Sequence, residues 1–198
     1  MITFQKIRWK NFLSTGNQFT EINFQNSSTN LIIGTNGAGK STLLDALTFV
    51  LFNKPFRKIN KPQLANTTNE RECLVEIEFE INTRQYIVRR GIKPNVFDIV
   101  VNGTELHREA DDRAMQRVLE DNILKVNYKS FTQIVILGSS TFVPFMQLTT
   151  ANRREVIEDL LDIRIFSLMN NILKDKIRTQ KEQVKSLDLK KETLKDKM

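Results

Sequence analysis

Hydrophobic and polar residues alternate along several stretches of the first 106 residues. The alternation is strictest over residues 72–81, where the apolar residues on one face are Cys73, Val75, Ile77, Phe79 and Ile81. Three glutamates occupy the opposite face, and this pattern predicts a half-buried antiparallel strand. Further strands are expected over residues 2–9, 19–24, 85–90, 98–101 and 104–106. Asn102 and Gly103 favour a type I′ hairpin turn between the last two of these strands.

Two apolar runs flank a glycine-rich loop. Residues 31–33 lead into the loop and predict a strand, whereas residues 43–52 leave it and predict a helix. Residues 111–123 have the spacing of an amphipathic helix, and the apolar run 131–137 fits either a strand or a buried helix. The order strand, loop, helix is the setting in which phosphate-binding loops occur.

From residue 151 the pattern is helical to the end of the chain. A heptad register has ten seam positions, of which seven are apolar and three are polar. The apolar ones are Ile163, Phe166, Leu173, Ile177, Val184, Leu187 and Leu194, and the polar ones are Asn170, Gln180 and Lys191. This register predicts a coiled coil, with a long amphipathic helix packed on its own domain as the alternative. The alternative is disfavoured because residues 174–198 are strongly polar outside the seam. We therefore expect two parts, residues 1–160 and an arm over residues 161–198, and we expect them to be a piece of a larger molecule.

The glycine-rich loop carries the complete motif G-x-x-x-x-G-K-[ST]. The residues expected to contact nucleotide are Gly34, Asn36, Gly37, Ala38, Gly39, Lys40, Ser41 and Thr42. The glycines permit tight turns and close approach of the backbone to phosphate, and the following helix directs free N–H groups at the anion. Lys40 is expected to bridge the β- and γ-phosphates, and Ser41 to bind Mg²⁺. A chance match in a chain of ordinary composition has a frequency of about one in a hundred.

Charge and composition narrow the possible partners. The net charge is +7, which favours a polyanionic partner. Two basic regions are candidates for DNA contact: the connection bearing Lys54, Arg57, Lys58 and Lys61, and residues 174–198, which hold nine basic and five acidic residues. The lone Cys73 excludes an intrachain disulfide and suits a reducing cytoplasm. No apolar run reaches membrane-spanning length.

One expected part of a nucleotide-hydrolysing site is missing from the sequence. A phosphate loop normally works with an acidic residue at the end of another apolar strand, which holds Mg²⁺ and orients water. No such strand follows Lys40, and Asp45 lies one turn into the helix that follows the loop. We therefore expect residues 1–198 alone to bind ATP weakly and to hydrolyse essentially none.

These motifs together resemble one family, the SMC-like, SbcC-type ATPases of double-strand-break repair. The resemblance is carried by the opening segment 7–14, the phosphate-loop block 31–45, the strand at 72–81 and the segment 142–161 that leads to the coiled coil. It implies an α/β fold, namely the N-terminal lobe of an ATP-binding-cassette head of the P-loop NTPase class, with an antiparallel β insert and an emerging coiled-coil helix.

The resemblance also implies a function. ATP and Mg²⁺ are the expected cofactors, and the expected partners are a second copy of the ATPase, a nuclease subunit near the base of the coiled coil, and double-stranded DNA. ATP binding is expected to close two heads and to gate DNA access to the nuclease. The alternative from a different class is an ATP-gated DNA clamp without a nuclease, and a transporter cassette fits the coiled coil poorly.

Two positions depart from the family pattern. Leu13 stands where members usually carry a basic residue. Ser139 stands where the family has a glutamine near Mg²⁺, because Gln133 falls six residues too early. A serine hydroxyl can still donate or accept a hydrogen bond to a metal-bound group, but it has a shorter reach.

Overall fold

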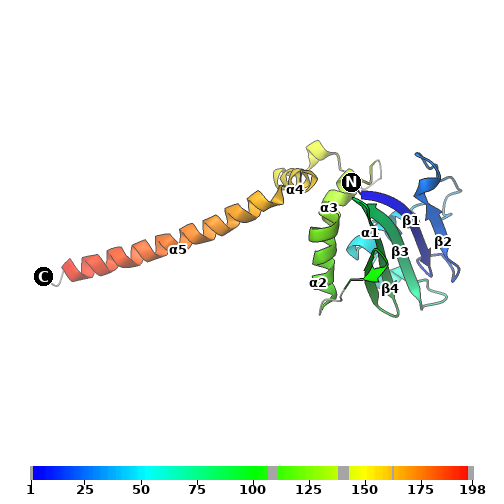
Figure 1. The fold of residues 1–198 in the computed structure, drawn as a ribbon, viewed down its shortest axis with the longest axis horizontal. Helices are drawn as coiled ribbons and strands as arrows, with labels where there is room; N and C mark the ends of the chain where they lie inside the picture. The colour runs from blue at the N-terminus through cyan, green and yellow to red at the C-terminus, as the bar shows by residue number, and fades with distance from the viewer. Residues whose placement is uncertain (1, 107–110, 138–142, 162, 196–198) are drawn as a thin grey trace. The chain divides into compact units, whose positions relative to one another are not determined.

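The computed structural model describes residues 2–106, 111–137, 143–161 and 163–195. The chain forms two compact units, Met1–Gln147 and Leu148–Met198. Figure 1 shows a twisted sheet with short helices in the first unit, and helices alone in the second. The predicted boundary between head lobe and arm at residue 160 stays a prediction. The compact units themselves divide earlier in the sequence, after Gln147.

The first unit is built on a six-stranded sheet in which every neighbouring pair is antiparallel. The order is β2-β1-β3-β4-β5-β6. The strands are β1 (Ile2–Lys10), β2 (Thr20–Asn23), β3 (Cys73–Ile81), β4 (Arg84–Ile92), β5 (Val96–Val101) and β6 (Thr104–Glu105). The hairpin turn between β5 and β6 has positive φ at both Asn102 (49°) and Gly103 (82°). This confirms the type I′ turn.

The alternation in β3 is realised with one difference. Cys73, Val75, Ile77 and Phe79 are buried, as predicted, and Ile81 is half-buried. Glu76 was expected on a solvated face but is also buried, because Arg8 of β1 and Arg89 of β4 both pair with its carboxylate. A buried charge is tolerated when it is paired and hydrogen-bonded, so the cross-strand arginines account for the difference.

Helices cover the apolar face of the sheet. Helix α1 (Thr42–Phe52) packs against β3 and β4 and is buried over most of its length. Helix α2 (Asp112–Arg117) continues into a π-helix, η3 (Val118–Leu124), and α3 (Tyr128–Ile134) makes the first four residues of the run 131–137 helical, while none of that run is a strand. Short 3₁₀ helices are η1 (Phe24–Asn26), η2 (Lys61–Leu64) and η4 (Phe145–Gln147).

The core between helices and sheet is rich in aromatic side chains. Phe79 stacks on Tyr86 with ring centroids 5.3 Å apart, and Phe4 meets Phe79 edge-on at 6.0 Å. Phe52 of α1 lies 5.0 Å from Phe131 of α3. The first two contacts tie neighbouring strands of the sheet together, and the third fixes α1 against α3.

The strand predicted over residues 31–33 is wrong for this chain. In the described part of the chain these residues pair with no strand, and Leu31 and Ile33 are 85% and 82% exposed. A continuous apolar run is typical of a strand that is covered on both faces within a parallel sheet. The described strands are all antiparallel, so they give this segment no such place.

The second unit contains α4 (Thr150–Leu160) and α5 (Arg164–Lys195). The predicted helical stretch is therefore interrupted once, near residues 161–163, and then continues as one helix of 32 residues. Its seam residues are exposed, among them Phe166, Leu173, Ile177, Val184 and Leu187. No helix among the described residues is long and apolar enough to cross a membrane.

Candidate nucleotide-binding site

The phosphate loop closes on itself through its own backbone and opens directly into α1. The N–H of Thr42, the first residue of α1, donates to the carbonyl of Gly39 at 2.9 Å. Gly37 and Gly39 have φ of 87° and 93°, which only glycine adopts readily. Gly34 is needed for a different reason, since a Cβ there would lie 3.2 Å from the Cβ of Ala38.

Lys40 folds back over the loop. Its ammonium donates to the carbonyls of Gly34 and Thr35 at 2.7 and 2.8 Å. An ammonium has three donors, so these two bonds hold the charge over the loop while one donor is left for an anion. This is the position from which a lysine can reach the phosphates of a bound nucleotide.

A cavity of about 510 Å³ lies beside the loop. The residues that line it are Leu13, Ser14, Asn36, Gly37, Gly39, Lys40, Ser41, Thr42, Arg57, Gln63, Ala65 and Thr67. The structure thus brings six of the eight predicted contact residues to one cavity, while Gly34 and Ala38 form the loop behind it. Its volume falls within the range of small-molecule sites.

The remaining wall of the cavity comes from residues 13–14 and 63–67. The family resemblance pointed to position 13, where members usually carry a basic residue, and no sequence motif pointed to residues 63–67. The N–H of Leu13 donates to the carbonyl of Leu64 at 2.7 Å, and the side-chain amide of Asn66 donates to the carbonyls of Leu13 and Thr15 at 3.1 and 3.0 Å. Leu13 has a φ of 53°, a left-handed conformation that is uncommon for leucine. No local pattern signals this wall, because its hydrogen bonds join positions about fifty residues apart.

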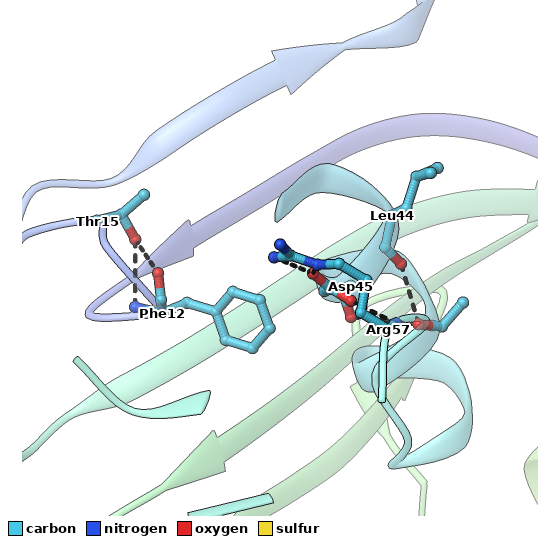
Figure 2. A network of polar contacts seen from close by, with 6 residues as sticks. Phe12, Thr15, Leu44, Asp45 and Arg57 are labelled. Carbon is cyan, nitrogen blue, oxygen red and sulfur yellow. Dashed lines mark hydrogen bonds and ion pairs between the residues drawn. The ribbon is translucent and has the colours of Figure 1, made fainter. Parts of the chain in front are cut away.

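The buried carboxylate of Asp45 forms an ion pair with the exposed Arg57 at the first turn of α1 (Figure 2). The Asp45 side chain is fully buried, and it accepts from the Arg57 backbone N–H at 2.9 Å and from Nε at 2.7 Å. Nη2 of Arg57 lies 2.6 Å from Oδ2 of the same carboxylate. Figure 2 also shows the nearby turn in which the Thr15 hydroxyl donates to the Phe12 carbonyl at 2.6 Å.

The four basic residues predicted to contact DNA do not share one environment. Arg57 lines the cavity and is held by Asp45, whereas the ammonium of Lys54 lies 5.6 Å from the centroid of the Tyr128 ring. Burial, followed by the nearby charge of Arg90, lowers the pKa of Lys61. We therefore keep Lys54, Lys58 and Lys61 as predicted DNA contacts and assign Arg57 to the cavity.

The metal ligands expected from the sequence are only partly placed. Ser41 lies at the cavity, where its hydroxyl suits an oxygen-seeking cation such as Mg²⁺. Ser139 lies outside the described residues. Among the residues that the structure describes, no cluster of three His, Cys, Asp or Glu side chains could hold a metal by itself. Both carboxylate oxygens of Asp45 are occupied by Arg57, which agrees with the expectation that Asp45 does not serve Mg²⁺.

Comparisons with known proteins agree with this geometry. A model of the AAA domain family matches residues 6–198. The "Exonuclease subunit 2" of Escherichia phage RB69 is 42% identical over 187 residues, which are 94% of this chain and 33% of that protein. The SbcC component of the nuclease SbcCD of Staphylococcus aureus strain Newman is 27% identical over 185 residues, which are 84% of this chain and 18% of that protein. This chain therefore spans at most about a third of the length of these relatives.

A solved structure supports the fold alone. It comes from work on "ATP-driven dimerization and DNA stimulated activation of SMC ATPases". Its sequence is 23% identical to this chain, and the two structures match with a TM-score of 0.56. The match covers 80% of this chain and 99% of the solved chain. The predicted fold class, the N-terminal lobe of a head of this type, is thereby confirmed.

Proposed function

The chain belongs to the AAA domain family, with relatives of the SbcC type of SMC-like ATPase, and from this premise we propose that it binds ATP with Mg²⁺ as the ATPase subunit of a DNA repair nuclease complex. The observation that carries the proposal is the phosphate loop with Lys40 folded over it at the mouth of a polar cavity. A cytoplasmic site of action, expected from the lone Cys73, belongs to the same proposal.

Each part of the site has a distinct task in this proposal. The backbone N–H groups of Gly37, Gly39, Lys40 and Ser41 surround the phosphates, and the Lys40 ammonium neutralises charge on the β- and γ-phosphates. Ser41 offers a hydroxyl to Mg²⁺, which supplies further neutralisation when bound. Leu13, Ser14 and Gln63 complete the lining of the cavity in which the nucleotide would lie.

Hydrolysis needs groups from outside these residues. Neither the sequence nor the described site supplies an acidic residue positioned for Mg²⁺ and water. We propose that another part of a longer protein supplies that acid, and that a second copy of the head completes the site. ATP-driven dimerization of the SMC ATPases whose fold this chain shares supports a head dimer. Hydrolysis would then reopen the heads and regulate DNA access to the nuclease.

The surface of α5 supports a protein partner. Near its start, exposed apolar side chains occupy several faces of the helix: Ile165, Phe166, Leu168, Met169, Ile172 and Leu173. A two-stranded coiled coil uses only one seam, so apolar residues remain beyond the seam. We propose that these residues bind the nuclease partner. The nuclease names of the relatives favour this function over a DNA clamp without a nuclease.

The experiment that tests the proposal is titration of the full-length protein with ATP and Mg²⁺. Lys40→Ala removes one charge-assisted contact, worth roughly 1.5–3 kcal/mol, so we expect affinity to fall about ten- to a hundredfold. Lys58→Ala is the matched control, since Lys58 is exposed and is not among the lining residues of the cavity. Equal affinity of wild type and Lys40→Ala would refute nucleotide binding at this loop.

A further inference from the structure

A buried arginine lies at the opposite end of α1 from the phosphate loop. Arg90 belongs to the core face of β4 and is 4% exposed. Its guanidinium carbon lies 3.7 Å from the centroid of the Phe97 ring, and its Nε donates to the carbonyl of Val50 at 3.1 Å. Its Nη2 donates to the side-chain oxygen of Gln116 in α2 at 2.6 Å. The side chain therefore joins β4, α1 and α2.

Gln116 extends this contact. Its amide nitrogen donates to the carbonyl of Leu51 at 2.9 Å and to the Glu120 carboxylate at 2.6 Å. Glu120 lies in the π-helix η3, a form of helix that is rare and is found often at functional sites. The buried polar group and the irregular helix thus occur together at the end of α1.

These side chains satisfy the terminal carbonyls of α1. The last four carbonyls of a helix lack partners within it, and α1 has no basic residue in its own last turn. The carbonyl of Phe49 accepts from the Asn53 backbone N–H, while Val50 and Leu51 accept from Arg90 and Gln116. Three donors therefore bond to the carbonyls at the C-terminal end of α1, namely the Asn53 backbone N–H and the side chains of Arg90 and Gln116.

The choice of residues points to a role beyond stability. Burial lowers the pKa of Arg90 to about 9, despite the opposing charges of Asp112 and Glu120, and this still leaves the guanidinium charged at neutral pH. Burial also raises the pKa of Glu120. Apolar side chains in place of buried charges are often neutral or stabilising. Arg90 adds directional hydrogen bonding, because its planar guanidinium donates in fixed directions and so fixes where the α1 carbonyls lie.

We propose that Arg90 and Gln116 are positioning residues for the phosphate loop, because they hold the C-terminal end of the helix whose N-terminal end forms that loop. The inference rests on the proposed nucleotide binding. Asp45 and Arg57 anchor the first turn of α1, so the helix is held by buried polar contacts at both ends. A shift or rotation of α1 would move the N–H groups of Lys40 and Ser41 relative to the phosphates.

The test measures nucleotide affinity in the full-length protein at a temperature at which every variant is folded. Gln116→Met keeps the side-chain length and Arg90→Met keeps the apolar part of the side chain, and each removes its bond to α1. We expect each to weaken ATP binding about two- to thirtyfold, the usual range of coupling through a packed network. Ile99→Ala is the matched control, because Ile99 is fully buried in β5 and belongs to the same core. It should lower the melting temperature but leave affinity unchanged.

Two further readouts separate positioning from general loosening. Amide exchange in the protein without nucleotide should rise over α1 and the phosphate loop in Arg90→Met and Gln116→Met, but not in Ile99→Ala. The effect of Arg90→Met should also shrink in a Lys40→Ala background, because both act through one loop. Wild-type affinity in both methionine variants, or an equal loss in Ile99→Ala, would overturn the inference. If Lys40→Ala alone were without effect, the proposed function would fail instead.

Discussion

Two apolar segments of the first unit differ in burial, since one is buried in the sheet and the other is exposed. Strand β3 finds β1 and β4 on either side, and its alternating apolar residues are buried against α1. The segment 31–33 is as apolar, yet Leu31 and Ile33 are exposed and pair with no described strand. Hydrophobicity alone does not decide burial. The partner strand must lie within the same chain, and for β3 it is supplied by a hairpin.

The same distinction, between features that have a partner within the chain and features that do not, applies to α5 and to charged side chains. The apolar seam residues of α5 from Phe166 to Leu187 are exposed, so they resemble the segment 31–33 rather than β3. Among the cations, Arg57 finds Asp45 within the unit, whereas Lys58 is exposed. Features with an internal partner support the fold of this chain, and features without one are those through which we expect it to bind other molecules.

The largest expected effect separates the two apolar segments. Phe79→Ala should lower the free energy of unfolding of residues 1–198 by about 3–5 kcal/mol, because it leaves a cavity beside Phe4 and Tyr86. Leu31→Ala should change it by less than about 0.5 kcal/mol, as for other surface substitutions. Urea denaturation measures both. A loss for Leu31→Ala approaching that of Phe79→Ala would show that segment 31–33 is packed in solution.

The sequence predicted the parts of the molecule whose causes are local. The phosphate loop, the β5–β6 turn and the alternation of β3 each depend on neighbouring residues, and each was located to within a residue or two. The strand at 31–33 was wrong because its partners are not among the described strands. The cavity wall from Gln63 to Thr67 and the burial of Glu76 and Arg90 depend on contacts between distant segments, which no local pattern reveals.

DNA binding should depend on Lys54, Lys58 and Lys61 rather than on Arg57, whose guanidinium is paired with a carboxylate. Replacing Lys54, Lys58 and Lys61 by methionine should reduce the slope of log affinity against log salt by up to about 3 units if each contacts a phosphate. Arg57→Met should leave the slope nearly unchanged, because its guanidinium is held by Asp45. Binding of duplex DNA by the full-length protein at several salt concentrations measures this. A slope that changes only with Arg57→Met would reverse the assignment.

A smaller effect is expected for the ion pair itself. Arg57→Met leaves the buried Asp45 carboxylate with the backbone N–H of residue 57 as its remaining partner of the three contacts described. We expect stability to fall by about 1–3 kcal/mol, the cost of an unsatisfied buried polar group. Asp45→Asn combined with Arg57→Met should recover part of that loss. Additive losses in the double-mutant cycle would show that the two side chains do not interact in solution.

The smallest effect concerns the seam of α5. Leu187 is exposed, so Leu187→Ala should change the stability of residues 1–198 by less than about 0.5 kcal/mol. In a longer protein that supplies the second helix of a coiled coil, the same leucine would be buried, and its loss would be expected to have an effect of about 2–5 kcal/mol on the arm. Amide exchange gives an independent measure, since residues 177–187 should exchange quickly in this chain and slowly in the longer one. Strong amide protection in a monomeric chain of 198 residues would mean that α5 already has an internal partner. It would then be a feature packed within the chain, like β3, rather than an exposed one, like segment 31–33.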